Sequence, residues 1–569
     1  MRKMKFIGVV ASAAFGVLGC ASPNGPLLGQ TGAAPVPVNS VAGTYLAASL
    51  AAAEGDVSNA ARFYNEMLKK DPGNPDLLER SFVFAASGGD LATAIPLAQR
   101  LVLLDPDNRR AHLVLAVAAL ENKNYELALD EIALAGRVPL ALLTNSVVEA
   151  WATEGLGRTD DAIGIIDRLN GQMGIEGLQA FHRALILDHS GRGEQADAAY
   201  KRALQLVGQA PRTNDAYGRL LRRQGRVEEA KALYLGMARG AANPVAKIAL
   251  AEIAGNRPAL ALVEEPAHGA AEGLFAIAAS FNAENSADAA ILYLNLALHL
   301  RPDLDLASAL LGDRYERGNQ FQMANDIYAR ISPRSPYQAL VQVQSALNLG
   351  RMDRANEAVD KLKLLTVQEP ENVDVLIALA DLSRSAGRDE DAIATYGKAI
   401  SLLPEGDGRI AGLHFARGVA HQSLKRWDDG ERDFTRTLAL SPERADALNH
   451  LGYSWVDRGK NLEEALRMLE KARMLRPRDG YIADSVGWAY FKLGRYREAA
   501  EILEEAVQLA PGISEMNDHL GDAYWRVGRK LDARFEWSHA LQLGPEPGMR
   551  PIIERKLQMG LDAAVENGT

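Results

Sequence analysis

The sequence predicts an all-α solenoid of about 14 stacked antiparallel helix pairs, and three observations support this fold class. First, a Leu-Gly or Val-Gly step recurs near the C-terminus at intervals of 35 and 34 residues. Second, each step is followed by an aromatic residue, two alanines and a proline in a fixed order. Third, the apolar residues between these markers follow the i, i+3, i+4 spacing of amphipathic helices. The three steps are Leu451-Gly452, Val486-Gly487 and Leu520-Gly521.

Each marker has a physical role in such a pair. The glycine of the step and the first alanine are expected where the two helices cross, because small side chains let the backbones approach closely. The aromatic residue is expected between one pair and the next. The proline ends the second helix, since it lacks an N–H and disfavours helix for the residue before it. The markers are Trp455, Tyr490 and Tyr524; Ala465, Ala499 and Ala533; Ala472, Ala506 and Ala540; and Pro477, Pro511 and Pro545.

A 34-residue period with Leu-Gly, Tyr, Ala, Ala and Pro in this order is similar to the tetratricopeptide repeat superfamily. The resemblance implies a right-handed superhelical solenoid whose first helices line a concave groove for protein partners. One pair alone cannot bury its apolar face, so stability depends on stacked neighbours. The strings at 451–459, 480–490 and 517–525 more narrowly resemble tetratricopeptide lipoproteins of the proteobacterial cell envelope.

The period divides the chain into segments. About six degenerate units are expected over 41–244, and about eight regular units over 271–550. The intervening 245–270 is predicted to be a degenerate unit or a hinge, with turns at Asn256-Arg257-Pro258 and from Glu264 to Gly269; an ordinary shortened repeat is the alternative. Residues 551–569 are expected to form a capping helix and tail, because a solenoid must cover its last apolar face.

The first 19 residues are predicted to be a signal peptide. Met1 to Lys5 is basic, and the apolar stretch that follows is about a dozen residues long, shorter than the ~20 needed to span a bilayer. Val17-Leu18-Gly19-Cys20 resembles a bacterial lipobox, which implies lipidation (palmitate among the acyl chains) at Cys20, the single cysteine of the chain. An ordinary signal peptide with a chance cysteine is the alternative.

The segment after this cysteine predicts the location of the protein. Residues 20–40 comprise the lipidated cysteine and a stretch rich in proline, glycine and small residues, which is typical of a flexible tether. Ala21 stands where an aspartate would favour retention in the inner membrane under the enteric sorting rule. We therefore expect a lipid-anchored protein of the bacterial cell envelope that faces the periplasm from the outer membrane.

Several function classes are not supported by the sequence. A formal net charge of -10 argues against a nucleic-acid binder. No phosphate-binding loop and no His-Glu-x-x-His motif occur, and a lone cysteine excludes cysteine-based zinc sites. We therefore predict no catalytic residue, no cofactor, no metal site and no small-molecule substrate. A glycan-acting enzyme using Asp518 and Asp522, one helical turn apart, is the alternative.

A partner-binding groove is predicted from positions flanking the Leu-Gly step. Its aromatic residues are expected to bury apolar partner groups and its aspartates to form an acidic rim, although some aromatics could instead be core between repeats. The aspartates would repel a carboxylate, so a basic or amide-rich segment is the expected ligand. The predicted groove residues are Asn449, Tyr453, Tyr481, Asp484, Trp488, Phe491, Asp518, Asp522, Trp525 and Arg526.

These observations predict a non-catalytic, lipid-anchored scaffold that mediates protein–protein interactions for envelope integrity or complex assembly. The alternative is an accessory lipoprotein of a secretion, pilus or exopolysaccharide-export machine, which would share the architecture but serve one dedicated partner.

Overall fold

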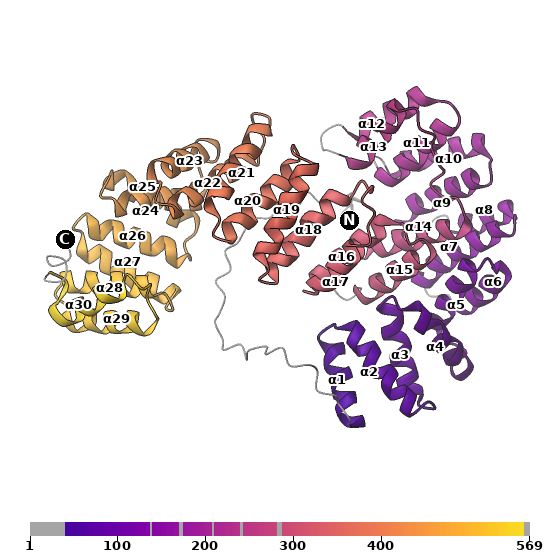
Figure 1. The fold of residues 1–569 in the computed structure, drawn as a ribbon, viewed down its shortest axis with the longest axis horizontal. Coiled ribbons are helices and arrows are strands. Elements are labelled where there is room, and N and C mark those ends of the chain that lie inside the picture. The colour runs from indigo at the N-terminus through magenta and orange to yellow at the C-terminus, as the bar shows by residue number, and fades with distance from the viewer. Residues whose placement is uncertain are drawn as a thin grey trace. The chain divides into compact units, whose positions relative to one another are not determined.

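The computed structural model describes residues 40–136, 139–169, 174–207, 210–238, 243–281 and 287–562, and these contain helices and turns but no strand. Thirty helices follow one another in the described residues (Figure 1). Twenty-eight of them form fourteen pairs along the chain, and α13 and α30 stand alone, so the predicted all-α repeat architecture is confirmed. The predicted signal peptide, the lipobox and all but the last residue of the tether lie outside the described residues.

The chain divides into two compact units, Met1–Asn348 and Leu349–Thr569, and the boundary falls within α18. The predicted break at 245–270 lies inside the first unit. The six pairs before it are α1 (Val41–Ala53) and α2 (Val57–Lys70), α3 (Pro75–Ser87) and α4 (Leu91–Leu104), α5 (Arg109–Glu121) and α6 (Tyr125–Leu134), α7 (Pro139–Gly155) and α8 (Thr159–Asp167), α9 (Glu176–His189) and α10 (Gly193–Val207), and α11 (Pro211–Arg223) and α12 (Val227–Met237).

The single helix α13 (Pro244–Ala254) comes next. The following pairs are α14 (Pro266–Ser280) and α15 (Ala287–Leu300), α16 (Asp305–Arg317) and α17 (Phe321–Tyr328), α18 (Gln338–Arg351) and α19 (Ala355–Gln368), α20 (Val373–Ser385) and α21 (Asp389–Leu402), α22 (Ile410–Ser423) and α23 (Trp427–Leu440), α24 (Ala445–Asp457) and α25 (Leu462–Leu475), α26 (Gly480–Lys492) and α27 (Tyr496–Leu509), and α28 (Ser514–Arg526) and α29 (Lys530–Gln542). The last helix is α30 (Arg550–Met559).

A residue with positive φ closes the turn between the two helices of most pairs. In the first six pairs these residues are 34 positions apart: Gly55, Gly89, Lys123, Gly157, Gly191 and Gly225. A left-handed residue lets the chain reverse within a few positions, and glycine adopts this conformation without steric cost. The repeat is therefore as regular in the N-terminal segment as near the C-terminus, although its closing prolines are erratic in the sequence.

The predicted close approach at the helix crossing is confirmed. A Cβ atom on Gly521 would lie 2.5 Å from Cδ1 of Trp537, and one on Gly418 would lie 2.8 Å from Cε1 of Phe434. The first alanine of the second helix is fully buried in each of the last three pairs. Small residues at the crossing thus allow a bulky side chain of the second helix to pack directly on the backbone of the first.

The first unit folds back on itself after α13. Helix α14 packs against α5, α7 and α9, and α15 packs against α3 and α5, all of them first helices of the preceding pairs (Figure 1). The predicted turn from Glu264 to Gly269 is wrong from Pro266 onward. Helix α14 begins at Pro266, because proline is favoured in the first helical turn, where its missing N–H needs no partner. The turn at Asn256 is confirmed and has a φ of 50°.

In the second unit the first helices form a row. Helix α24 contacts α26, and α26 contacts α28, while each second helix packs behind its own partner. Helix α30 packs against α29 at the end of this row. All ten predicted groove residues lie on three successive first helices of this row.

Candidate partner-binding groove

The predicted groove residues come from three first helices, with Asn449 and Tyr453 on α24, four residues on α26 and four on α28. Residues three or four positions apart share a face of a helix. Tyr481, Asp484, Trp488 and Phe491 therefore follow one face of α26, as the sequence predicts. The structure gives each of these side chains a different environment.

The aromatic residues of α26 form a stack. The Trp488 ring lies 4.8 Å from the Phe491 ring and 4.0 Å from the His519 ring, nearly parallel to both. Lys492 Nζ lies 5.0 Å from the Trp488 ring, within range of a cation–π interaction. Trp488 and Phe491 are half-buried. Trp488 therefore contacts the neighbouring repeat through His519, and part of each ring remains exposed.

Tyr453 and Tyr481 are the polar aromatics of the groove. Tyr481 is 52% exposed, whereas Tyr453 is half-buried and donates a hydrogen bond of 3.0 Å to Oε1 of Glu515 at the start of α28. Burial, followed by the charge of Glu515, raises the pKa of Tyr453, so the phenol stays protonated. The Tyr453–Glu515 hydrogen bond spans the row from α24 to α28. Asn449 beside it is half-buried, and its Oδ1 accepts no hydrogen bond from the described residues.

Asp484 is buried and paired with a histidine of the next repeat. His519 Nδ1 lies 3.0 Å from Oδ1 of Asp484. Burial alone would lower the pKa of His519, but the Asp484 carboxylate outweighs this effect and raises the pKa to about 9. His519 is therefore an imidazolium at neutral pH, and the pair carries no net charge.

Asp518 and Asp522 are buried around a lysine of the last helix. Lys556 Nζ donates to Asp518 at 2.7 Å and to Asp522 at 2.8 Å, and all three residues are at most 5% exposed. Asp522 also accepts a hydrogen bond of 3.0 Å from Nε1 of Trp537. Burial raises the pKa of Asp522 to about 6, although Lys556 opposes the shift. The carboxylate oxygens of Asp518 and Asp522 thus accept hydrogen bonds from Lys556 and Trp537, so the cluster needs no ligand to satisfy them.

Asp484, Asp518 and Asp522 therefore do not form the exposed acidic rim expected from the sequence. Unpaired buried carboxylates would be costly, and here His519 and Lys556 remove that cost. The same burial weighs against the glycan-acting alternative, because a general acid or base must reach the substrate within hydrogen-bonding distance. Asp518 is 1% exposed and its carboxylate already holds the Lys556 ammonium group.

Trp525 and Arg526 bind Asp562, the last residue that the structure describes. Trp525 Nε1 donates a hydrogen bond of 3.0 Å to Asp562, and Arg526 forms an ion pair with the same carboxylate. The Trp525 ring lies 5.3 Å from Trp537, and Lys530 Nζ lies 3.6 Å above it. Gly560 packs so closely on the Trp525 ring that a side chain at this position would clash. Trp525 is thus an internal anchor for the segment after α30.

The sequence reasoning missed Lys556, His519 and Glu515 as parts of this region. His519 follows Asp484 by one repeat, so the period itself could have suggested that the two side chains are neighbours in adjacent first helices. Lys556 lies 38 residues from Asp518, in the predicted cap, and no local pattern assigns its partner. Its pairing with Asp518 can be recognised only when the position of α30 against α28 is known.

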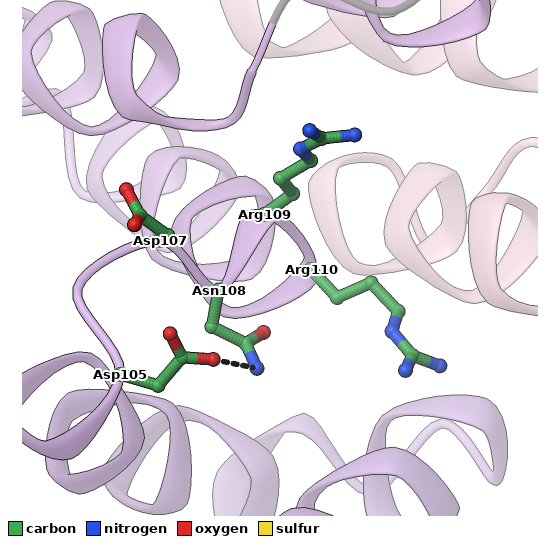
Figure 2. A pocket seen from close by; sticks show the side chains of 5 residues that line it. All are labelled: Asp105, Asp107, Asn108, Arg109 and Arg110. Carbon is green, nitrogen blue, oxygen red and sulfur yellow. Dashed lines mark hydrogen bonds between the residues drawn. The ribbon is translucent and has the colours of Figure 1, made fainter.

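Three further features bear on function. A shallow surface hollow between α4 and α5 is lined by Asp105, Asp107, Asn108, Arg109 and Arg110 (Figure 2). Asn108 there caps α5 and bonds to Asp105, as loop residues commonly do, so the hollow is a turn rather than a binding site. Within the described ranges no three His, Cys, Asp or Glu side chains are grouped to hold a metal ion. No described helix combines the length and hydropathy required to cross a membrane.

Comparison with known proteins supports the repeat assignment. The tetratricopeptide repeat model matches residues 85–140, 340–407 and 415–479, and a second tetratricopeptide repeat model matches residues 483–513. A TPR repeat-containing protein of Pseudomonas aeruginosa, PA4667, is 27% identical over 194 residues, which cover 34% of this chain and 32% of the relative. The Protein CTR9 homolog of Arabidopsis thaliana is 28% identical over 140 residues, 24% of this chain and 12% of that protein. The chain thus matches about a third or less of the length of these relatives.

Two solved structures are among those to which the chain is similar. A tetratricopeptide repeat protein of Parabacteroides merdae is 18% identical, with a TM-score of 0.36, and the match covers 44% of this chain and 97% of that one. A chain from the crystal structure of the APC/C hetero-tetramer Cut9–Hcn1 is 16% identical, with a TM-score of 0.37, and the match covers 91% of this chain and 96% of that one.

Proposed function

Because the chain is built from tetratricopeptide repeats, we propose that it is a non-catalytic scaffold that holds partner proteins in the groove of its second unit. We propose further that a lipid on Cys20 anchors it in the bacterial cell envelope, facing the periplasm at the outer membrane. Solenoids of this kind present a preformed surface to partners, so little ordering entropy is lost when a partner binds.

The accessible aromatic surface of α26 is the observation that carries this proposal. Tyr481 is exposed, and Trp488 and Phe491 are half-buried on the same face of the helix. Rigid aromatic side chains are typical anchors of protein interfaces, because they bury a large area with few rotatable bonds. The carboxylates below them are neutralised internally, so the surface favours an apolar anchor rather than a highly charged ligand.

The polar edge of this surface indicates the chemistry of the partner. Glu515 is exposed and already accepts a hydrogen bond from Tyr453. A carboxylate has further acceptor sites that an amide, lysine or arginine of a partner can fill. We therefore propose a partner segment with an apolar or aromatic side chain next to an amide or basic residue.

The proposed location rests on the N-terminal sequence. The basic start, the short apolar stretch and the lipobox-like Val17-Leu18-Gly19-Cys20 support lipidation at the single cysteine. One acyl chain gives only marginal membrane binding and several give stable anchoring, at about 0.8 kcal/mol per buried methylene. The stretch rich in proline and glycine that follows would let the helical units reach partners away from the bilayer.

The test is affinity capture from detergent-solubilised envelopes. Tyr481→Ala with Trp488→Ala is expected to lower partner recovery at least about tenfold, because interface anchors contribute about 2 kcal/mol or more each. Phe535→Ala is the matched control, since Phe535 is 69% exposed on the second helix α29 and outside the groove. Equal recovery with both proteins would refute the groove assignment. Recovery of one export complex alone would assign the chain to a dedicated machine.

A further inference from the structure

The first helices of four of the first six pairs are covered by a later segment of the chain itself. Helices α14 and α15 lie against α3, α5, α7 and α9, which are the first helices of four successive pairs. In a solenoid of helix pairs the first helices line the concave face, where partners bind. The second unit has no equivalent pair among its described helices, because each helix from α20 to α29 packs in sequential order.

Helix α14 is shaped for close contact with this surface. Gly269 faces the indole of Trp151. Gly273 faces Val147, and a Cβ added to Gly273 would lie 3.1 Å from Cε1 of His182. In both places a side chain would clash with α7 or α9. Ala270 and Ala271 between them are fully buried. The backbone of α14 thus rests directly on the wall of the groove.

A buried charge fixes the position of α14. Glu272 is 1% exposed and accepts a hydrogen bond of 2.9 Å from Nε of Arg212 on α11. Arg301, just after α15, lies 3.1 Å from the same carboxylate. Burial would raise the pKa of Glu272, but Arg212 outweighs it and the pKa is lowered, so the carboxylate is charged. Separating α14 from α11 would leave charges unpaired in an apolar surrounding, which is strongly unfavourable.

Polar side chains of α15 and at the start of α17 also bind the early helix pairs. Asn295 Nδ2 donates a hydrogen bond of 2.7 Å to the carbonyl of Ser87 at the end of α3, and Thr144 Oγ1 lies 3.1 Å from the Tyr293 hydroxyl. The Gln320 side chain donates to the carbonyl of Gly55, between α1 and α2. These contacts join segments 149 to 265 residues apart, from the first pair to the fourth.

We propose that α14 and α15 are a built-in ligand of the N-terminal groove, which stays closed to other proteins. Partner binding is therefore confined to the second unit, a conclusion that rests on the proposed scaffold function. Two properties indicate that α14 and α15 do not move aside to admit a partner protein. Its occupant buries a paired charge, and glycines at its contact surface leave no space that a competing helix with larger side chains could use.

Hydrogen exchange on the wild-type full-length protein tests the closure without any variant. The amides of α14 are expected to exchange at least about 100-fold more slowly than those of α13, which has few buried residues. Exchange of α14 at the rate of α13 would show that the pair opens readily and would overturn the proposal. This readout requires no partner, so it remains decisive if the proposed scaffold function is wrong.

A disulfide lock tests the consequence for binding. Val147→Cys with Gly273→Cys places two sulfurs across the contact between α7 and α14, and the first change removes Val147 Cγ1, the atom that a Cβ at position 273 would otherwise meet. The full-length oxidised protein is expected to recover the same partners as its reduced form, within about twofold. If oxidation abolishes recovery, the groove must open for binding and the proposal fails. Val147→Cys alone, treated with the same oxidant, controls for side reactions.

Discussion

The ammonium group of Lys556 lies 2.7 Å from Oδ2 of Asp518, although the two residues are 38 positions apart. This contact joins α30, the last helix of the described chain, to the first helix of the last repeat. Both side chains are buried, so the end of the solenoid is closed by an ion pair in its interior rather than by apolar contacts alone.

Replacing Lys556 with methionine should destabilise the second unit. Two buried carboxylates would lose their cation, and breaking such a pair from one side costs about 3–5 kcal/mol. Urea unfolding followed by circular dichroism would measure the loss. The control is Arg550→Met, because Arg550 forms an exposed ion pair with Glu554 on the same helix and should contribute less than about 1 kcal/mol.

A triple variant separates charge burial from packing. With Asp518→Asn and Asp522→Asn added to Lys556→Met, no buried charge remains in the cluster, and much of the lost stability should return. If the triple variant is as unstable as the single one, the lysine acts through its packing and the ionic account is wrong.

The Asp484–His519 pair should make stability dependent on pH. The pKa of His519 is raised to about 9 in the fold, from about 6.5 in the unfolded chain. The contribution of the pair is therefore complete below about pH 6.5 and is lost as the pH rises through about 9. The total change is about 3 kcal/mol at most.

Unfolding free energies measured between pH 6 and pH 9.5 would check this sign. His519→Gln should be less stable at pH 6 and should show a flatter dependence on pH over the same range. An unchanged slope in this variant would mean that another group causes the dependence.

Gly269→Ala should destabilise the first unit. The added methyl group would clash with the Trp151 indole, and overpacking of this kind costs about 1–3 kcal/mol. Gly164→Ala on α8 is the matched control, because nothing lies within 4 Å of its added Cβ. That change should stabilise the helix by up to about 1 kcal/mol. Equal effects of the two substitutions would contradict the close packing of α14 on α7.

Lipidation of Cys20 is tested directly by metabolic labelling. Wild-type protein should incorporate an alkyne-tagged fatty acid, and Cys20→Ser should not, because it removes the single thiol in the chain. The variant should also leave the lipid-anchored membrane fraction. Ser22→Ala, two residues further on, is the control for effects on secretion. Labelling of Cys20→Ser would place the lipid elsewhere and end this part of the proposal.

The repeat itself could be predicted from the sequence because it depends on residues near one another in the chain. The glycine at each helix crossing, the alanines and the period of 34 all act within one pair or between neighbours. Lys556 and α14 could not be placed in the same way. Their partners are set by how the whole stack curves, and spacing along the chain does not contain that information.

Gly269 and Gly273 illustrate the limit. A glycine near a proline and acidic residues is typical of a turn, and this context predicts a turn that includes Gly269. In the structure it lies inside α14 and faces the Trp151 indole, where a side chain would clash. The predicted exposure of the groove aspartates is wrong for the opposite reason. Their residue type suggested exposure, but distant Lys556 and neighbouring His519 make their burial possible.

The packing of α14 and α15 against earlier helices also affects when each unit can fold during synthesis. In the first unit, bonds such as Asn295 to Ser87 and Gln320 to Gly55 join positions 208 and 265 residues apart, so closure must wait until most of that unit has left the ribosome. The pairings of the second unit, such as His519 with Asp484 at 35 residues and Tyr453 with Glu515 at 62, span one or two repeats and can form as successive repeats emerge. High contact order slows folding, whereas nearest-neighbour stacks can grow and fray one repeat at a time. We therefore expect the first unit to form late and unfold as a whole, and the second to unravel progressively from its ends.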